Sequence, residues 1–362
     1  MTPLGGRHNS MDTVQSWAEA PGSSHAVEFT GNWKEYLPIA LTNLILTIVT
    51  LGIFRFWAKA RERRYLWSRS RLIGDRLEWT GTGSEMFIGF LIAMGVLVGS
   101  VAFLFGGAVL LGDWFMVMGL IAFYVFILWA VGFARFRALR YRLSRTYWRG
   151  IRGGSDDNGV SYGWTALGNN FLAILTLGIL TPRAIARNWN DRMRKMSFGP
   201  HMLDSNVDTV GLQWRWMMLY AVYAGFIAVL AFTATEPATG EPEIDLLGFG
   251  AVLLLMLALA LVMISFWALF YNKAAGTFRM GELSADFDVS ALEWLKFYAK
   301  VVGLTIVTFG LGLIMWGYWR WEFVMDRLEL HGEVNLDTLT QSTTTVPKEA
   351  EGFADAFDIG AI

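Results

Sequence analysis

The chain has no cysteine, only four histidines, and little charge for its length of 362 residues. Without cysteine there is no disulfide, no thiolate metal site and no thiol nucleophile. The glycine-rich loops that bind nucleotide phosphates, the HExxH zinc motif and the Gly-x-Ser-x-Gly nucleophile elbow are also missing. The histidines lie far apart in the sequence. We therefore expect no enzyme activity, no catalytic residues, no cofactor and no metal site.

Four long segments contain no charged residue, and 54% of the whole chain is hydrophobic. A helix of about 20 apolar residues crosses the ~30 Å hydrocarbon core of a bilayer, so each segment is long enough to span it. The absence of ionisable side chains from these segments argues against a proton relay through them. The spans form two hairpins, with turns at residues 112–113 and 236–245. The four predicted spans are residues 86–111, 114–134, 216–235 and 246–271.

Basic residues are bunched, although the formal net charge is only −1. The bunches lie at residues 55–76, 135–152 and 183–195, whereas the turn at 236–245 has no Lys or Arg. Because loops rich in Lys and Arg stay in the cytoplasm, we expect the basic segments inside and both hairpin turns outside. Seven conventional crossings would place residues 183–195 outside. The favoured arrangement is therefore four crossings plus three re-entrant or interfacial helices, with seven spans as the alternative.

A motif repeated three times marks the re-entrant segments. Thr50-Leu51-Gly52 recurs as Thr176-Leu177-Gly178 and, more faintly, as Thr308-Phe309-Gly310. Glycine tolerates the backbone angles that break a helix. The expected organisation is a polar tail at residues 1–26, a membrane domain at 27–340 with repeat cores near 36–82, 162–206 and 294–338, and an acidic, disordered tail at 341–362.

Polar residues of the repeats form a seam, which is the first candidate site. Residues three or four apart share one stripe of a helix. An unpaired amide or hydroxyl is costly in hydrocarbon, so the stripe should face protein or water. It either joins neighbouring helices around a kink or lines a path for a small solute. The seam consists of Asn43, Thr47, Thr50, Asn169, Thr176 and Thr308.

Arginines beyond the second span form the second candidate site. If the helix continues, four of them fall on one side of it, at about 100° per residue. That side would meet the phosphates of anionic inner-leaflet lipid, at roughly 1 kcal/mol per basic residue. Alternatively, the arginines only orient the protein. Nucleic acid is not an expected partner, because the chain has no soluble basic domain. The four are Arg142, Arg145, Arg149 and Arg152.

A glycine follows every helix that returns to the cytoplasm. Short strands or extended turns would explain these glycines, and helix C-caps would explain them equally well. The predicted fold class is an all-α polytopic membrane protein: a helical bundle with internal repeats, two transmembrane hairpins and three re-entrant or interfacial helices, with short cytoplasmic strands as an addition. The glycines are Gly74, Gly150, Gly199, Gly281 and Gly332.

Several of these motifs together resemble the YjgN-like family of bacterial inner-membrane proteins, a family of unknown function. The resemblance runs from about residue 27 to residue 340. It implies a multi-pass protein of the bacterial cytoplasmic membrane and supplies no substrate or catalytic residue. The chain departs from the pattern at residues 153–157, and in the third repeat Val301 replaces the asparagine. The matching motifs are Phe29-Thr-Gly31, Thr50-Leu51-Gly52, Trp57-Ala-Lys-Ala-Arg61 and the stretch from Ser144 to Arg152.

Two functions fit these features best, and an enzyme acting on a lipid substrate is a weaker third. The first expectation is transport or permeation of a small solute through a polar site open to the cytoplasm, because many carriers use broken polar helices. The alternative is an anionic-lipid-binding or scaffold protein of the inner leaflet, which the basic bunches and 17 tryptophans favour. Membrane lipids are the expected partners in either case.

Overall fold

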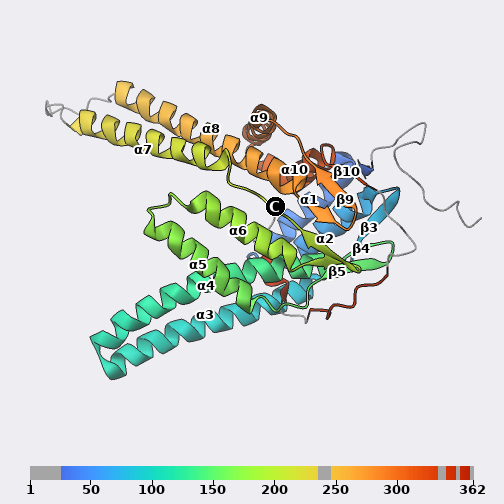
Figure 1. Ribbon diagram of the computed structural model, residues 1–362, viewed down its shortest axis with the longest axis horizontal. Coiled ribbons are helices and arrows are strands. Elements are labelled where there is room, and N and C mark those ends of the chain that lie inside the picture. The colour runs from blue at the N-terminus through green and yellow to red at the C-terminus, as the bar shows by residue number, and fades with distance from the viewer. Residues whose placement is uncertain (1–25, 235–245, 333–339, 348–350, 359–362) are drawn as a thin grey trace, which may run out of the picture.

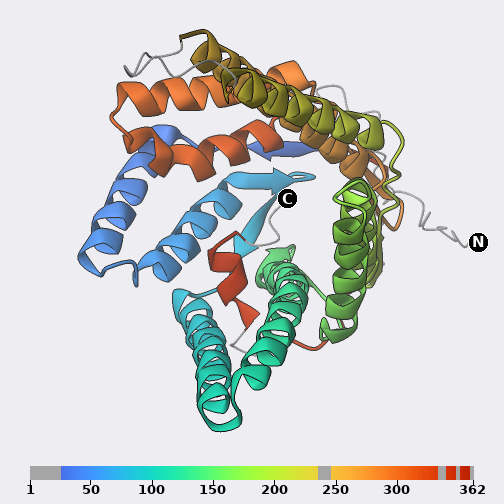
Figure 2. The ribbon, with the colours of Figure 1, turned by 90° about the vertical axis from the view of Figure 1, so that its left-hand side faces the viewer.

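Five helical pairs follow one another along the chain, and Figure 2 shows them arranged around a common centre. The computed structural model describes residues 26–234, 246–332, 340–347 and 351–358. Each pair contacts the next, and the last contacts the first, so the pairs close a ring. The pairs are α1 (Trp33–Val49) with α2 (Arg55–Arg69), α3 (Gly83–Leu111) with α4 (Asp113–Arg145), α5 (Val160–Leu175) with α6 (Thr181–Arg194), α7 (Leu212–Ala234) with α8 (Leu246–Gly276), and α9 (Ala291–Val307) with the 3₁₀ helix η2 (Leu311–Met315) and α10 (Trp316–Met325).

Short strands connect these pairs, so the chain is mostly helical, as predicted, but it is not all-α, because the strands form a ten-stranded sheet. They form one antiparallel sheet in chain order. Figure 1 shows the strands at one end of the molecule, with the helices α3 to α8 extending from it. Strands of two to five residues carry too little alternation to be recognised from sequence. The strands are β1 (Val27–Phe29), β2 (Ser70–Leu72), β3 (Asp75–Trp79), β4 (Thr146–Trp148), β5 (Ile151–Gly154), β6 (Ser197–Phe198), β7 (His201–Asp204), β8 (Arg279–Met280), β9 (Leu283–Asp286) and β10 (Glu329–His331).

Four of the five predicted glycines lie in the turns of this sheet rather than at helix C-caps, and the fifth, Gly332, follows its last strand, β10. Gly74 and Gly150 are the second residues of two-residue turns, with φ of +81° and +75°. The residues before them, Ile73 and Arg149, also have positive φ, at +49° and +53°. Two-residue hairpin turns with this twist match the twist of the flanking strands. These turns fold the chain back after each helical pair.

The repeated motif forms the same turn three times at the tips of the shorter helical pairs. In the first copy Leu51 and Gly52 have φ of +50° and +91°, and the other copies agree within 2° at both positions. The hydroxyl of Thr50 donates to the carbonyl of Leu46 (2.7 Å) and accepts from the amide of Phe54 (2.9 Å). This turn sends the chain back toward the sheet. The residue at each tip is 85–98% exposed and apolar: Leu51, Leu177 and Phe309.

Four helices in the described part of the chain are long and apolar enough to cross a membrane, as predicted. By length and composition they are Gly83–Leu111, Asp113–Arg145, Leu212–Ala231 and Gly248–Gly276. The predicted spans overlap these four closely. The second predicted hairpin turn, at residues 236–245, lies outside the described residues, as does nearly all of the N-terminal tail.

The hydrophobic core is divided into three clusters placed around the ring. The first joins α1, α2, α3, α4 and α10, and includes Trp67 and Tyr318. The second joins α4 to α8, with Phe136 and Phe266 completely buried. The third joins α8, α9 and α10 around Trp294. Each cluster thus packs neighbouring helical pairs together, and no single core fills the whole molecule.

The acidic tail differs from the disorder predicted for it. Its residues 340–347 run along β5, where the side chain of Gln341 donates to the carbonyl of Gly150 (2.7 Å). Its residues 351–358 contain α11 (Phe353–Ala356), which packs against α2, α3 and α4. Asp355 is fully buried and Glu351 is 4% exposed. The acidic composition of the tail predicted a solvated segment. Ion pairs with basic residues of α2 and α4 hold it in place instead.

Candidate functional site

A cavity of about 360 Å³ lies inside the ring, between α4, α6, α8, α9, α10 and the strands β9 and β10. Most of its wall is aromatic or aliphatic, with Trp189 from α6 and Trp316 from α10 among the contributors. Two guanidinium groups interrupt this apolar lining, those of Arg142 on α4 and Arg320 on α10. The cavity therefore combines a hydrophobic wall with localised positive charge.

A second cavity, of about 380 Å³, adjoins the first between α8 and α9. Both are lined by Tyr271, Trp294 and Tyr298, so these three side chains form their common wall. The remaining residues that line the second cavity lie between Ala260 and Ala268, within the apolar span of α8. The two cavities together extend from the apolar span of α8 toward Arg142 and Arg320.

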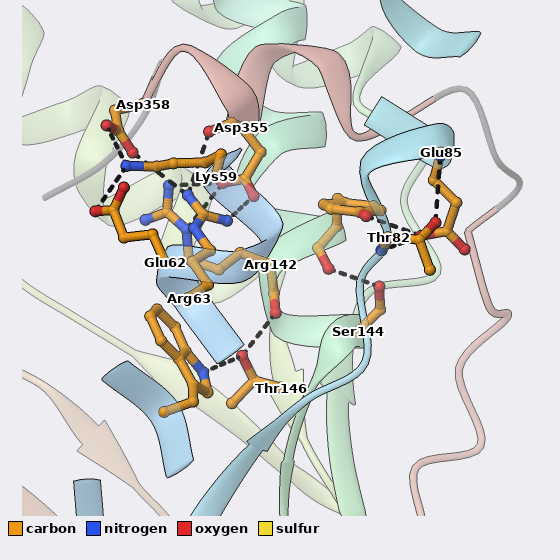
Figure 3. Close-up of polar contacts among 12 residues, drawn as sticks. Lys59, Glu62, Arg63, Thr82, Glu85, Arg142, Ser144, Thr146, Asp355 and Asp358 are labelled. Atoms are coloured by element: carbon orange, nitrogen blue, oxygen red, sulfur yellow. Dashed lines mark hydrogen bonds and ion pairs between the residues drawn. The ribbon is translucent and has the colours of Figure 1, made fainter. Parts of the chain in front are cut away.

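Arg142 also takes part in a cluster of ion pairs beside the cavity. Its Nε and Nη2 donate to Oδ1 of Asp355 at 3.0 and 2.8 Å, and Arg63 of α2 pairs with Oδ2 of the same carboxylate. Arg63 further contacts Asp358 at 3.4 Å, and Lys59 Nζ donates to Asp358 at 2.8 Å. Figure 3 shows Asp355 beside the guanidiniums of Arg63 and Arg142. The C-terminal carboxylates thus connect α2 and α4.

Burial and mutual charge set the ionisation of this cluster. Burial lowers the pKa of Arg63, although neighbouring carboxylates partly oppose the shift. Burial raises the pKa of Asp358, but Lys59 and Arg63 together bring that pKa below its usual value. The lowered pKa keeps Asp358 charged near neutral pH. Charge-assisted hydrogen bonds of this kind are stronger than neutral ones.

A further arginine lies next to the cavity without a counter-ion. Arg192 occupies α6 between Trp189 and Met193, which both line the cavity, and it is only 7% exposed. Its guanidinium lies over the Trp189 ring at 5.4 Å, and its Nε has no hydrogen-bond partner. Within the described residues it makes no ion pair. Burial lowers the pKa of this group, because the charged form is poorly solvated there.

The residues of the predicted polar seam form hydrogen bonds within the helical pairs. The amide of Asn43 donates to the carbonyl of Ala58 (3.3 Å), and that of Asn169 donates to the side chain of Asn188 (2.8 Å). Each bond joins the two helices of one pair. Thr176 and Thr308 bond within their turns as Thr50 does, and the carbonyl of Thr47 accepts from Gly52 in the first turn. These contacts favour the helix-joining interpretation over a path for a solute.

The four predicted lipid-binding arginines do not share one face. Helix α4 ends at Arg145, and the chain then turns into β4 and β5, so the assumed continuous helix is wrong. Arg142 binds Asp355, and Arg145 binds Glu85 at 2.7 Å. Arg149 pairs with Asp75, and Arg152 donates to the carbonyl of Thr344. Each guanidinium has a partner within the chain, and only Arg142 also lines the cavity.

The residues that matter most for this site were missed by the sequence interpretation. Arg63 and Arg192 belong to basic segments that were assigned only to orientation, and Arg320 lies outside these segments, on α10. One signal was available: Glu351, Asp355 and Asp358 are spaced as one face of a helical segment, which suits a docked tail better than a solvated one. Within the described residues no group of three or more potential metal ligands occurs.

Comparison with known proteins places this architecture in a family. Residues 24–356 match the family described as "Bacterial protein of unknown function (DUF898)". The chain belongs to this family. It is also 29% identical over 131 residues to "Inner membrane protein YjgN" of Salmonella typhimurium, an alignment that covers 36% of this chain and 31% of that protein. No solved structure matches the chain.

A second relative supports the same assignment. The chain is 37% identical over 68 residues to "Inner membrane protein YjgN" of Escherichia coli K12, covering 19% of this chain and 17% of that protein. The aligned part thus spans less than a third of each of these two curated relatives. Together with the four apolar helices, the match identifies this DUF898 member as an integral membrane protein of a family whose function is unknown.

Proposed function

We propose that this DUF898 protein binds an anionic amphiphile taken from the lipid bilayer. The observation that carries the proposal is the cavity with an aromatic wall and two guanidiniums, Arg142 and Arg320. Ligand cavities of a few hundred Å³ are mostly apolar and contain a few polar groups that fix orientation. An alkyl chain would lie against the aromatic wall, and an acidic head would bind the arginines.

The neighbouring cavity suggests how such a ligand would arrive. Between α8 and α9, the side chains of Tyr271, Trp294 and Tyr298 line both the cavity beside the membrane span and the inner cavity. Rotation of these side chains would join the two spaces without moving a helix. A lipid could then enter sideways from the bilayer, which keeps its chain away from water. Transport of a small polar solute has less support, because the cavity wall is apolar and the polar seam is used in helix contacts.

We also propose that the sheet end of the molecule faces the cytoplasm and that the three motif turns dip into the bilayer. The apolar tips Leu51, Leu177 and Phe309 suit hydrocarbon, and the basic helices α2 and α6 lead back to the sheet. The Lys/Arg bias of these segments supports the same orientation. The two longer hairpins, α3–α4 and α7–α8, would then cross the membrane, giving four crossings in total.

Labelling of single cysteines tests this orientation without background, since the natural chain has none. In intact spheroplasts, a membrane-impermeant maleimide is expected to label Asp113→Cys in the α3–α4 turn. Met202→Cys in β7, where the side chain is 60% exposed, should react only after permeabilisation. External labelling of Met202→Cys would contradict four crossings and restore the alternative with seven.

Replacing Arg320 by Gln tests the binding function directly. The variant keeps a polar side chain in the cavity wall but removes the charge, which contributes about 1.5–3 kcal/mol to a charged hydrogen bond. We therefore expect anionic lipid that co-purifies with the protein to fall by roughly tenfold or more, as measured by mass spectrometry of the extracted protein. Zwitterionic lipid should not change.

Arg183→Gln is the matched control, because this arginine is exposed on α6 and does not line the cavity. It removes the same charge from the protein while leaving the cavity intact. Equal losses of anionic lipid from both variants would mean that the lipid is held only by surface charge. That result would reject the cavity as the binding site.

A further inference from the structure

We propose that the ligand of this cavity ends in a phosphate monoester or diphosphate, and that residues 351–358 occupy its headgroup site until it binds. The inference rests on the proposed binding function and specifies the chemistry of the ligand. It starts from the carboxylates of the C-terminal segment, of which Asp355 binds the cavity-lining Arg142 (Figure 3). These carboxylates act as an internal substitute for the ligand's head.

The geometry of the ion pairs indicates the charge of the head. Both oxygens of Asp355 are engaged, Oδ1 by Nε and Nη2 of Arg142 and Oδ2 by Arg63. Asp358, three residues later, is bound by Arg63 and Lys59. Three cations thus converge on two neighbouring anions. A phosphate monoester or diphosphate presents several charged oxygens within the same small space, and the planar guanidinium fork binds such oxygens in pairs.

Arg142 makes the two binding events exclusive. Arg142 lines the cavity, and two of its three guanidinium nitrogens, Nε and Nη2, hold Asp355. An acidic head that binds these two nitrogens from the cavity displaces this carboxylate. Binding of the ligand and docking of the C-terminal segment compete for one set of donors, so each weakens the other.

Charge balance requires an exchange of anions rather than simple loss of the segment. The segment supplies three carboxylates to the basic surface of α2 and α4, where Glu351 binds Arg137 at 3.0 Å and Arg140 at 3.4 Å. Burial of a cation without a counter-ion is costly. When the segment leaves, an incoming anion would offset that cost. Among the ion pairs of the described residues, only Lys59 would then keep a carboxylate, Glu62 at 3.3 Å. The cations that would lose theirs are Arg63, Arg137, Arg140 and Arg142.

The segment is built so that it can leave. Helix α11 has only four residues and is the last described element, so no later described helix or strand holds it down. Figure 2 shows it on the inner side of α2, α3 and α4. Apart from the ion pairs, Phe357 packs on Phe56 and Phe90 and under the guanidinium of Arg55, and the small side chains of Ala354 and Ala356 are buried. Release would not require any membrane-spanning helix to move.

The test measures binding of three probes to the purified full chain and to Asp355→Asn. The probes are palmitoyl lysophosphatidic acid, which carries a phosphate monoester, palmitate, which carries one carboxylate, and inorganic pyrophosphate, which has no chain. We expect Asp355→Asn to bind lysophosphatidic acid about tenfold more tightly than the natural chain, because the internal competitor is weakened. Palmitate should bind both proteins more weakly than lysophosphatidic acid does.

Two further proteins keep the test decisive. Deletion of residues 351–362 should give the same gain even if Asp355→Asn disturbs folding. Glu85→Gln is the matched control, because it breaks an ion pair with Arg145 on the same helix and leaves Arg142 untouched. It should bind as the natural chain does. In the natural chain, lysophosphatidic acid should also remove hydrogen-exchange protection from the amides of residues 353–357.

Each outcome is informative. If lysophosphatidic acid binds equally to the natural chain, Asp355→Asn and the deletion, the competition is wrong while the binding function stands. Equal affinity for palmitate would reject the phosphate head. If pyrophosphate alone binds as tightly as lysophosphatidic acid and releases the segment, the ligand is a soluble phosphate and the amphiphile is rejected. Failure of all three probes to bind any of these proteins would reject both the function and this inference.

Discussion

Trp67→Ala is expected to destabilise the protein by about 3–5 kcal/mol, the usual cost of emptying a buried tryptophan site. The large effect follows from where Trp67 lies. The sheet is open between β1 and β10, which pair with β2 and β9 respectively and not with each other. Where the first and last helical pairs meet, Trp67 of α2 stacks on Trp321 of α10 with the ring centroids 4.4 Å apart. Side-chain packing replaces the missing strand pairing.

Neighbouring contacts support the same closure. The indole of Trp67 donates to the hydroxyl of Thr146 (2.9 Å), and that of Trp321 donates to Ser70 (2.8 Å). The hydroxyl of Tyr318 donates to the carbonyl of Gly31 (3.1 Å), which ties α10 to the start of the chain. Removing Trp67 therefore weakens the junction between the first and last helical pairs.

Trp67→Phe is the control for this prediction. It keeps an aromatic ring for stacking but loses the hydrogen bond to Thr146, so we expect a loss of about 1 kcal/mol. Unfolding of both variants can be followed by tryptophan fluorescence during denaturant titration in one detergent. If Trp67→Ala were no less stable than Trp67→Phe, the stack would not be what closes the ring.

The sequence predicted the parts of this fold that depend on local patterns. The four apolar spans, the Thr-Leu-Gly turns and the glycines of the hairpins each depend on a few adjacent residues, and each is present. Gly52 and Gly74 adopt positive φ, which glycine does at little cost, so a turn at each position can be predicted from the residue type. The strands were harder to predict, since β6 and β8 have two residues each. Such strands exist because the helical pairs bring them together.

The candidate site could not be predicted because its parts are far apart in the sequence. Arg142 and Asp355 are separated by 213 residues, and the cavity is lined by residues of α4, α6, α8, α9 and α10. Periodicity cannot show which of thirty basic residues faces a cavity. The helical period also gave the wrong positions for Arg149 and Arg152, because α4 ends at Arg145 and these residues follow in the β4–β5 hairpin. Only the ring closure brings the arginines to one place.

Arg192→Met is expected to stabilise the ligand-free protein by about 1–4 kcal/mol while reducing binding of the anionic amphiphile. Arg192 is 7% exposed, has no carboxylate partner among the described residues, and leaves its Nε without a hydrogen bond. Methionine fills a similar volume without a charge to desolvate. A buried cation that costs stability is best explained by function, because binding sites retain charges that folding alone would remove.

The decisive measurement is a pair of opposite effects in one protein. Thermal unfolding of lipid-depleted Arg192→Met should occur at a higher temperature than in the natural chain, whereas its affinity for palmitoyl lysophosphatidic acid should fall. Arg145→Met provides the matched control, because Arg145 pairs with Glu85 at 2.7 Å and its loss leaves that carboxylate without its cation. That variant should unfold at a lower temperature. If Arg192→Met also lost stability, the guanidinium would be serving the fold through its contact with Trp189, and the excess positive charge beside the cavity would need no ligand to explain it.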